Sequence, residues 1–182
     1  MSQETPSLLP KVGLRNLKTA LSATLCAALY AIFDANPTFA CIGAIFGMGS
    51  DMEDSWKNGG NRLIGTVIGG FLGMGLFRVF LSLESHGGRA WLLTLLFVGV
   101  VALIVASQIF RWPGAIQPGG VVLCIILFNT PESTYISYAL HRMVDTGLGV
   151  LVSLGINLLL PRERLDRWLD RWRAFQAARR QG

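Results

Sequence analysis

The chain has 182 residues, of which 52% are hydrophobic and 15% are charged, and its net charge is +5. A soluble domain usually carries about 25% charged residues, so this composition excludes an ordinary soluble protein. Residues 91–109 contain no charge at all, and about 20 apolar residues are enough to cross the hydrocarbon core of a bilayer. The composition therefore predicts an integral membrane protein.

The amino-terminal residues are polar, and the first hydrophobic segment follows a short basic stretch. Residues 1–10 form a polar, acidic tail without the features of a removable signal peptide, so we expect the first hydrophobic helix itself to direct insertion. The basic stretch 11–18 leads directly into that helix, 19–33. The next apolar segment, 38–49, would cover only about 18 Å as a helix, which is short for a full crossing.

The middle of the chain alternates between polar connections and apolar helices. We predict a polar loop at 50–62 and a third helix at 63–83, followed by a turn-rich connection. A fourth helix is predicted at 90–110. The residues at 111–114 include Pro113 and Gly114 and should end that helix.

The last third of the chain contains a second short apolar segment and a final long one. The run Pro118-Gly119-Gly120 is expected to interrupt the chain before the short segment 121–128. A polar loop at 129–138 and a spanning helix at 139–160 follow. Residues 162–182 should form a basic amphipathic helix on the membrane surface, because their apolar residues recur at spacings of three and four.

A polar signature appears twice, each time at the head of a long apolar stretch. The two copies read Asn61-Arg62-Leu63-Ile64-Gly65-Thr66 and His141-Arg142-Met143-Val144-Asp145-Thr146. They lie 80 positions apart, and Gly69 and Gly75 align with Gly149 and Gly155 without a gap. This pattern predicts two copies of a three-helix unit, at about 19–83 and 90–160, and repeats of this kind build transport pathways in lipid.

The basic residues predict the orientation. The tail carries seven arginines against three acids, so it should be cytoplasmic, as should the basic stretch near the amino terminus. Six crossings would make the second unit an inverted copy of the first. Four crossings, with both short segments only dipping into the membrane, would make it a parallel copy. The basic residues of the loops favour six.

A few charges lie in or near the predicted spans. A charge inside a spanning helix costs at least about 2.5–3.5 kcal/mol on insertion scales, so it needs a partner. Arg142 and Asp145 are three residues apart on one helix face, and His141 lies four residues before Asp145. This cluster either couples a proton or contacts an anion, or it only anchors the helix at the interface. Arg62 and Lys18 present the same choice between an anion contact and an anchor.

The first copy of the signature differs from the second in one respect. Gly65 stands where the second copy has Asp145, so Arg62 must find a partner elsewhere. The expected partners are the acids of the preceding polar loop, which are Asp51, Glu53 and Asp54.

The short segments and the glycines suggest further roles. In repeat-built transporters, short or interrupted helices at matching positions indicate the substrate site, and a helix amino terminus favours an anion. Pro37 and Pro118 lie at such positions, and Phe39 and Phe46 offer an apolar wall, unless the prolines merely end packing helices. Glycines at a spacing of four predict helix packing, within the bundle or between protomers. These are Gly65, Gly69, Gly73, Gly43 and Gly47.

Several classes of function find no support. The three cysteines lie in apolar runs without metal-ligand spacing, so no metal site is predicted. No nucleotide-binding glycine loop is present, and no nucleophile with a base and an orienting group can be assembled. We therefore expect neither an enzyme nor a cofactor nor a nucleic-acid partner.

The residues between about 11 and 161 resemble the aromatic acid exporter, or fusaric acid resistance (FUSC-like), membrane domain. The matching runs are Gly13-Leu14-Arg15-Asn16-Leu17-Lys18-Thr19-Ala20, Pro37-Thr38-Phe39-Ala40, Gly60-Asn61-Arg62-Leu63-Ile64-Gly65-Thr66 and Tyr138-Ala139-Leu140-His141-Arg142-Met143-Val144-Asp145-Thr146, with Ser55 and Asn157. The resemblance implies a bacterial inner-membrane exporter of aromatic carboxylic acids, driven by the proton gradient. Members of the family can work with a periplasmic adaptor protein, and a single unit should form a homo-oligomer.

The sequence thus predicts an all-α polytopic membrane protein of about six transmembrane segments. Its domains would be a polar tail (1–10), a membrane domain (11–161) and a cytoplasmic amphipathic helix (162–182) in contact with lipid. The predicted function is efflux of small organic anions, with Arg142 and Asp145 as the coupling pair and Arg62 and Lys18 as anion contacts. The alternatives are a passive anion channel built from several copies and a membrane scaffold with a basic cytoplasmic tail.

Overall fold

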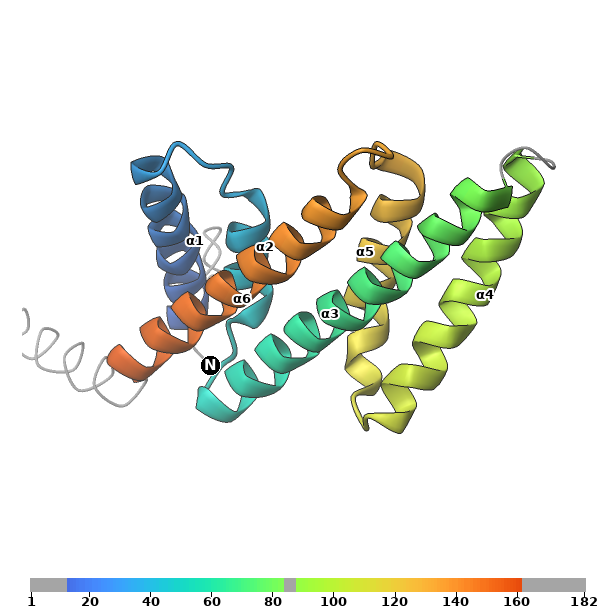
Figure 1. Ribbon diagram of the computed structural model, residues 1–182. Helices are drawn as coiled ribbons and strands as arrows, with labels where there is room; N and C mark the ends of the chain where they lie inside the picture. Colours follow the sequence, from blue (N-terminus) through green and yellow to red (C-terminus); the bar gives the residue numbers. More distant parts are fainter. Residues whose placement is uncertain (1–12, 84–87, 162–182) are drawn as a thin grey trace, which may run out of the picture.

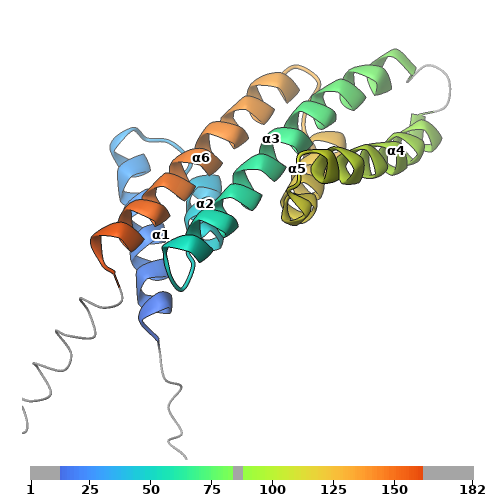
Figure 2. The ribbon, with the colours of Figure 1, turned by 90° about the horizontal axis from the view of Figure 1, so that it is seen from below.

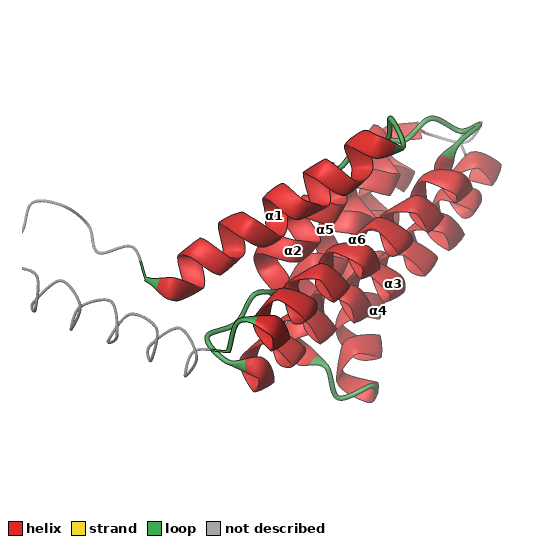
Figure 3. Ribbon diagram, turned by 90° about the vertical axis from the view of Figure 1, so that its left-hand side faces the viewer, coloured by secondary structure: helices red, strands yellow, loops and turns green. Residues whose placement is uncertain are grey.

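The computed structural model describes residues 13–83 and 88–161, and the predicted tail helix at 162–182 lies outside them. The described residues form six α-helices and one short 3-10 helix, joined by loops (Figure 3). Their bounds are α1 Leu14–Ile32, α2 Thr38–Gly47, α3 Met52–Leu83, α4 Gly88–Ile109, η2 Pro113–Ala115, α5 Ile116–Asn129 and α6 Tyr135–Leu159. The prediction of an all-α chain is confirmed.

Three of the described helices are long and apolar enough to cross a membrane. These are α3, α4 and α6, whereas α2 and α5 are shorter apolar helices. Successive helices alternate in direction, so that the start of α1 and the end of α6 lie at the lower end of Figure 1. The chain is a multi-pass membrane protein by this arrangement and composition.

The antiparallel pair α3 and α6 forms the centre of the bundle (Figure 2). The short helix α2 packs mainly on α6, and the short helix α5 packs mainly on α3. On the outside, α1 covers α2 and α6, and α4 covers α3 and α5. Each short helix therefore rests on the long helix that lies far from it in the sequence.

The predicted loop at 50–62 is wrong, because α3 begins at Met52 and runs for 32 residues. Asp51 caps this helix, since its Oδ1 accepts a hydrogen bond of 2.8 Å from the backbone N–H of Asp54. Acidic residues in the first turn also suit the positive end of the helix dipole. Gly59 and Gly60 in this segment lie at close contacts between helices: a Cβ on Gly59 would meet Val150, and one on Gly60 would meet Trp112.

The predicted interruption at Pro118-Gly119-Gly120 is also wrong, because α5 runs through it from Ile116 to Asn129. Pro118 is the third residue of the helix, where the missing N–H removes no bond that the first turn needs. Gly119 lies where α5 approaches α3, and a Cβ there would stand 2.9 Å from the carbonyl oxygen of Gly65. The proline and the glycine thus mark a helix start and a close contact.

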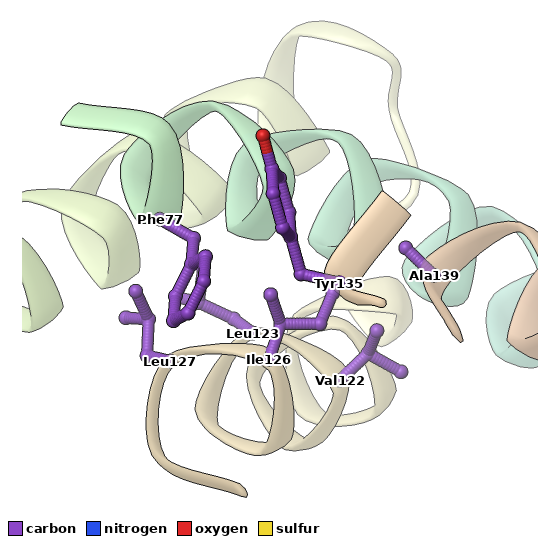
Figure 4. Close-up of a cluster of buried hydrophobic side chains, with 7 residues drawn as sticks. All are labelled: Phe77, Val122, Leu123, Ile126, Leu127, Tyr135 and Ala139. Atoms are coloured by element: carbon purple, nitrogen blue, oxygen red, sulfur yellow. The ribbon is translucent and has the colours of Figure 1, made fainter. Parts of the chain in front are cut away.

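The final helix begins four residues earlier than the predicted bound of 139, at Tyr135. Tyr135 is buried, and its ring lies 5.0 Å from the ring of Phe77. Both belong to the apolar cluster in which α3, α5 and α6 meet (Figure 4). The cluster consists of Phe77, Val122, Leu123, Ile126, Leu127, Tyr135 and Ala139. Burial in this cluster stabilises the extra turn, which the sequence analysis had assigned to the polar loop at 129–138.

The first helix of each predicted unit ends in the same way. Asp34 after α1 and Arg111 after α4 both adopt left-handed backbone angles, with φ of 49° and 59°. In each case the next N–H reaches back five residues: Ala35 donates to the Tyr30 carbonyl at 3.1 Å, and Trp112 to the Ser107 carbonyl at 2.8 Å. This is the Schellman motif, which reverses the chain sharply after a helix.

Candidate functional site

The ion pair predicted on the last helix is present. Arg142 Nη2 lies 3.5 Å from Asp145 Oδ2, one turn further along α6. The other carboxylate oxygen of Asp145 accepts a hydrogen bond of 2.7 Å from the Tyr30 hydroxyl on α1. Asp145 is only 9% exposed, so its charge is held by these two partners and not by solvent.

Two aromatic rings enclose the guanidinium of Arg142. Its Cζ lies 3.5 Å from the centroid of the Phe39 ring on α2 and 4.7 Å from that of Tyr138 on α6. The two rings meet edge to face, with centroids 6.4 Å apart. A cation over aromatic faces is stabilised by the ring quadrupoles. Arg142 is thus provided with a carboxylate and two rings by its own chain, and α1, α2 and α6 all meet at this point.

Two neighbouring candidates from the sequence take no part in these contacts. His141 is exposed, although it lies next to Arg142 in the sequence. Pro37 precedes the first residue of α2 as its N-cap position, so it ends the connection and places Phe39 near Arg142.

Arg62 lies in different surroundings. It is 8% exposed and its Cζ lies 5.4 Å from the centroid of the Phe46 ring, while its Nε has no hydrogen-bond partner. The expectation that a loop acid would pair with it is wrong within the described residues. Asp51 caps α3, and Glu53 and Asp54 stay exposed in the first turn of that helix, which is two turns or more away from Arg62.

Arg62 faces a cleft of about 430 Å³ between α2, α3 and the start of α5. The lining residues are Phe46, Asn58, Asn61, Arg62, Gly114, Gln117, Pro118 and Val121. The helical segment Pro113–Asn129 begins at this cleft, so the positive end of its dipole adds to the charge of Arg62. Three side-chain amides supply hydrogen-bonding groups. The cleft therefore combines a cation, polar groups and an apolar wall.

Lys18 belongs to a third polar group, at the lower end of the bundle in Figure 1. It is 4% exposed, and its Nζ donates a hydrogen bond of 2.8 Å to Asn157 Oδ1. The amide nitrogen of Asn157 in turn donates to Ser55 Oγ at 2.8 Å and to the Asp51 carbonyl at 2.7 Å. This network ties the start of α1 to the end of α6 and the start of α3.

The five glycines at a spacing of four all face another helix of the same chain. A Cβ on Gly65 would meet Ala115 and Pro118, and one on Gly69 would meet the backbone of Gly119. The others would meet a neighbour in the same way: Gly73 with Ile126, Gly43 with Thr146, and Gly47 with Ser153. These contacts lie within the bundle, at the crossings of α3 with α5 and of α2 with α6.

The structure adds site residues that the sequence analysis did not single out. Tyr30 and Tyr138 complete the surroundings of Arg142 and Asp145, and Asn58, Asn61 and Gln117 line the cleft at Arg62. One of them had a local signal. The buried residues of α1 are Lys18, Ser22, Cys26 and Tyr30, and their regular spacing of four marks a single buried helix face that ends at Tyr30.

Comparison with known proteins covers nearly the whole described region. Residues 10–160 match the family model described as aromatic acid exporter family member 1. The chain is also similar to a UPF0421 protein from Halalkalibacterium halodurans, with 26% identity over 151 residues, which cover 83% of this chain and 40% of the relative. It thus spans less than half the length of that relative. No solved structure matches the chain.

Proposed function

The chain belongs to the aromatic acid exporter family, and from this premise we propose that it exports aromatic carboxylic acids or similar small organic anions across the bacterial inner membrane, coupled to proton entry. Membership supports a transporter and not an enzyme. The family description names the kind of substrate, and the two arginines supply the positive charge that an anion needs inside a membrane protein.

The observation that carries the proposal is the buried carboxylate of Asp145 on a candidate spanning helix. Ionisable groups inside spanning segments are expensive, and they mark ion and proton pathways in transporters. Ionised Asp145 holds α6 to α1 through Tyr30 and balances Arg142. A proton from outside would remove this charge and weaken both contacts. Since three helices meet at Asp145, its protonation state then selects between two arrangements of α1 and α2 relative to α6.

We further propose that the fold is two inverted three-helix repeats with six crossings. Three features support this. The short helix of each unit packs on the last helix of the other unit, α2 on α6 and α5 on α3. The crossings fall at equivalent glycines, with Gly69 against Gly119 and Gly149 against Ala40. The first helix of each unit ends in the same motif. An inverted repeat gives a transporter two related conformations, open to opposite sides.

The experiment that tests the function is flux of labelled benzoate from proteoliposomes that contain the purified full chain. We expect efflux well above that of protein-free liposomes, and faster when the outside is made acidic. Equal flux with and without the pH gradient would indicate a passive anion channel instead. Flux no greater than in protein-free liposomes would overturn the transporter proposal and favour a membrane scaffold.

A further inference from the structure

The two arginines at equivalent positions of the repeat differ in what surrounds them. Arg142 lies on α6 against Phe39, the second residue of α2. Arg62 lies 80 positions earlier on α3, beside a cleft that includes Gln117, the second residue of α5. In both cases the arginine of one unit faces the amino end of the short helix of the other unit. The two sites therefore lie at related places in the bundle and can be compared group by group.

Arg142 contacts one carboxylate and two aromatic rings of its own chain, and none of these three groups has a counterpart at Arg62. The carboxylate of Asp145 corresponds to Gly65, which has no side chain. The ring of Tyr138 corresponds to Asn58. The ring of Phe39 corresponds to Pro118, because the matching crossings of Gly149 with Ala40 and of Gly69 with Gly119 align Ala40 with Gly119. Asn58 and Pro118 both line the cleft, so there is open space beside Arg62 where aromatic rings fill the space beside Arg142.

Arg62 is consequently a buried cation without a carboxylate among the described residues. It is more than nine-tenths buried and lines a cleft of about 430 Å³. Its Nε lacks a hydrogen-bond partner, as does the Nε of Arg142, but Arg142 has the carboxylate of Asp145 beside it. A buried charge is costly unless it is paired. The start of the helical segment Pro113–Asn129 at the same cleft adds a second attraction for an anion. The cleft is within the usual range of small-molecule sites, roughly 300–1,000 Å³.

We propose that this cleft binds a carboxylate that carries a planar ring, and that the ligand supplies the groups that Arg142 receives from its own chain. The ligand carboxylate approaches from the cleft and pairs with the guanidinium of Arg62, as Asp145 pairs with that of Arg142. Its ring takes the place of Phe39 and Tyr138, with Phe46 as a wall. At the Arg142 site the protein itself supplies the carboxylate and the rings, so that site binds no ligand. Each chain therefore binds one ligand, at Arg62. This inference rests on the proposed export function, because the ligand would be the exported anion.

Binding can be measured separately from transport, with purified full-length protein in nanodiscs and labelled benzoate. We expect the wild type to bind one benzoate per chain. Benzamide, which has no charge, should fail to compete. Cyclohexanecarboxylate, which has the charge without the aromatic ring, should bind about 3- to 10-fold more weakly, as the loss of a cation–π contact of about 1 kcal/mol implies.

The most discriminating variant is Asn58→Asp, in which the protein itself provides a carboxylate beside Arg62. Asn58 lies four residues before Arg62 on α3 and lines the same cleft, so an aspartate there can pair with the guanidinium. The change is isosteric, and we expect it to weaken benzoate binding at least about tenfold, since it removes roughly one charge-assisted contact. Arg62→Gln should do the same. Asn16→Asp makes the same charge change on the exposed side of α1 and should leave binding unaltered.

The possible outcomes distinguish a failure of the proposed binding site at Arg62 from a failure of the proposed export function. Benzoate binding that is unchanged in both Asn58→Asp and Arg62→Gln would overturn the site, whatever the transport assay shows. Binding that depends on Arg62 together with flux no greater than in protein-free liposomes would keep the site and overturn export. Transport by a wild type that shows no binding at millimolar benzoate would exclude this cleft as the substrate site. Circular dichroism and gel filtration of each variant verify that a loss of binding is not a loss of fold.

Discussion

Lys18, Arg62 and Asp145 are each less than a tenth exposed, although each carries a charge in the ionised form. Lys18 and Asp145 have partners on other helices, Asn157 and Tyr30. Arg62 instead contacts the ring of Phe46 and lines a cleft. A change at the first two residues should therefore disturb contacts between helices, whereas a change at Arg62 should mainly alter ligand binding.

Replacing Asp145 with Asn tests its role in proton coupling. Asparagine keeps the shape and can still accept a hydrogen bond from Tyr30, but it cannot take up a proton. We expect benzoate flux in proteoliposomes to lose its response to an imposed pH gradient. Glu132→Gln removes an exposed carboxylate from the loop before α6 and serves as the control. A response to the gradient as large as in the wild type would remove Asp145 from the coupling mechanism.

Asn157→Leu tests the polar network at the lower end of the bundle. It would leave Lys18 Nζ without its amide acceptor and Ser55 without one donor. Loss of a hydrogen bond to a charged group costs roughly 1.5–3 kcal/mol, so thermal unfolding in detergent should shift to a clearly lower temperature. Asn129→Leu changes an exposed residue at the end of α5 and should have little effect. Equal shifts in both variants would contradict a stabilising role for the network.

Two helix crossings depend on glycines that are aligned in the proposed repeat, Gly69 and Gly149. A Cβ on Gly69 or Gly149 would collide with the backbone of the short helix packed against it, and backbone cannot move aside as a flexible side chain can. We expect Gly69→Ala and Gly149→Ala each to destabilise the fold by about 1–3 kcal/mol, the usual cost of overpacking. Thermal unfolding in detergent measures this change.

The chain provides a matched control for those substitutions. Gly75 and Gly155 are also aligned in the proposed repeat and lie six residues further along the same two helices, but a Cβ on either would meet nothing within 4 Å. Gly75→Ala and Gly155→Ala should therefore be neutral, or slightly stabilising because alanine favours helix. If all four variants behaved alike, the close approach at Gly69 and Gly149 would not be important for stability.

The number of crossings is a property of the whole molecule, and single-cysteine labelling distinguishes the two schemes. With six crossings, Ser50 and Arg111 lie on the same side as the start of α1, whereas Asp34 and Glu132 lie on the opposite side (Figure 1). With four crossings, Ser50 and Arg111 would lie on the same side of the membrane as Asp34 and Glu132. Because Cys26, Cys41 and Cys124 are free thiols, each cysteine is introduced after these three have been replaced by alanine.

The six-crossing proposal makes a definite labelling prediction. A membrane-impermeant maleimide added to spheroplasts should label cysteines at 34 and 132 and should reach those at 50 and 111 only after the membrane is permeabilised. Labelling of all four positions from outside would show that α2 and α5 only dip into the membrane. The repeats would then be parallel, and the proposed alternation between two related conformations would have to be abandoned.

The helix content followed from local sequence where the local signal was strong. The charge-free run predicted a helix at 90–110, and α4 spans Gly88–Ile109; Pro37 set the start of α2 at Thr38, as expected. The prediction failed at 50–62, where glycines and polar residues are poor helix formers in isolation. There the contacts of Gly59 with Val150 and of Gly60 with Trp112 override the local preference. Such contacts join residues far apart in the sequence.

The sequence by itself determined that this is a helical membrane protein, where most of its apolar helices lie and which charges they carry. It also placed Arg142 beside Asp145, because their spacing of three is a local property of a helix. Only the tertiary structure decided which partner each charge receives. Tyr30 and Asp145 lie 115 positions apart, and Lys18 and Asn157 lie 139 apart. Pairs so distant meet only when the helices pack, so the same packing that places aromatic rings around Arg142 leaves Arg62 facing an open cleft.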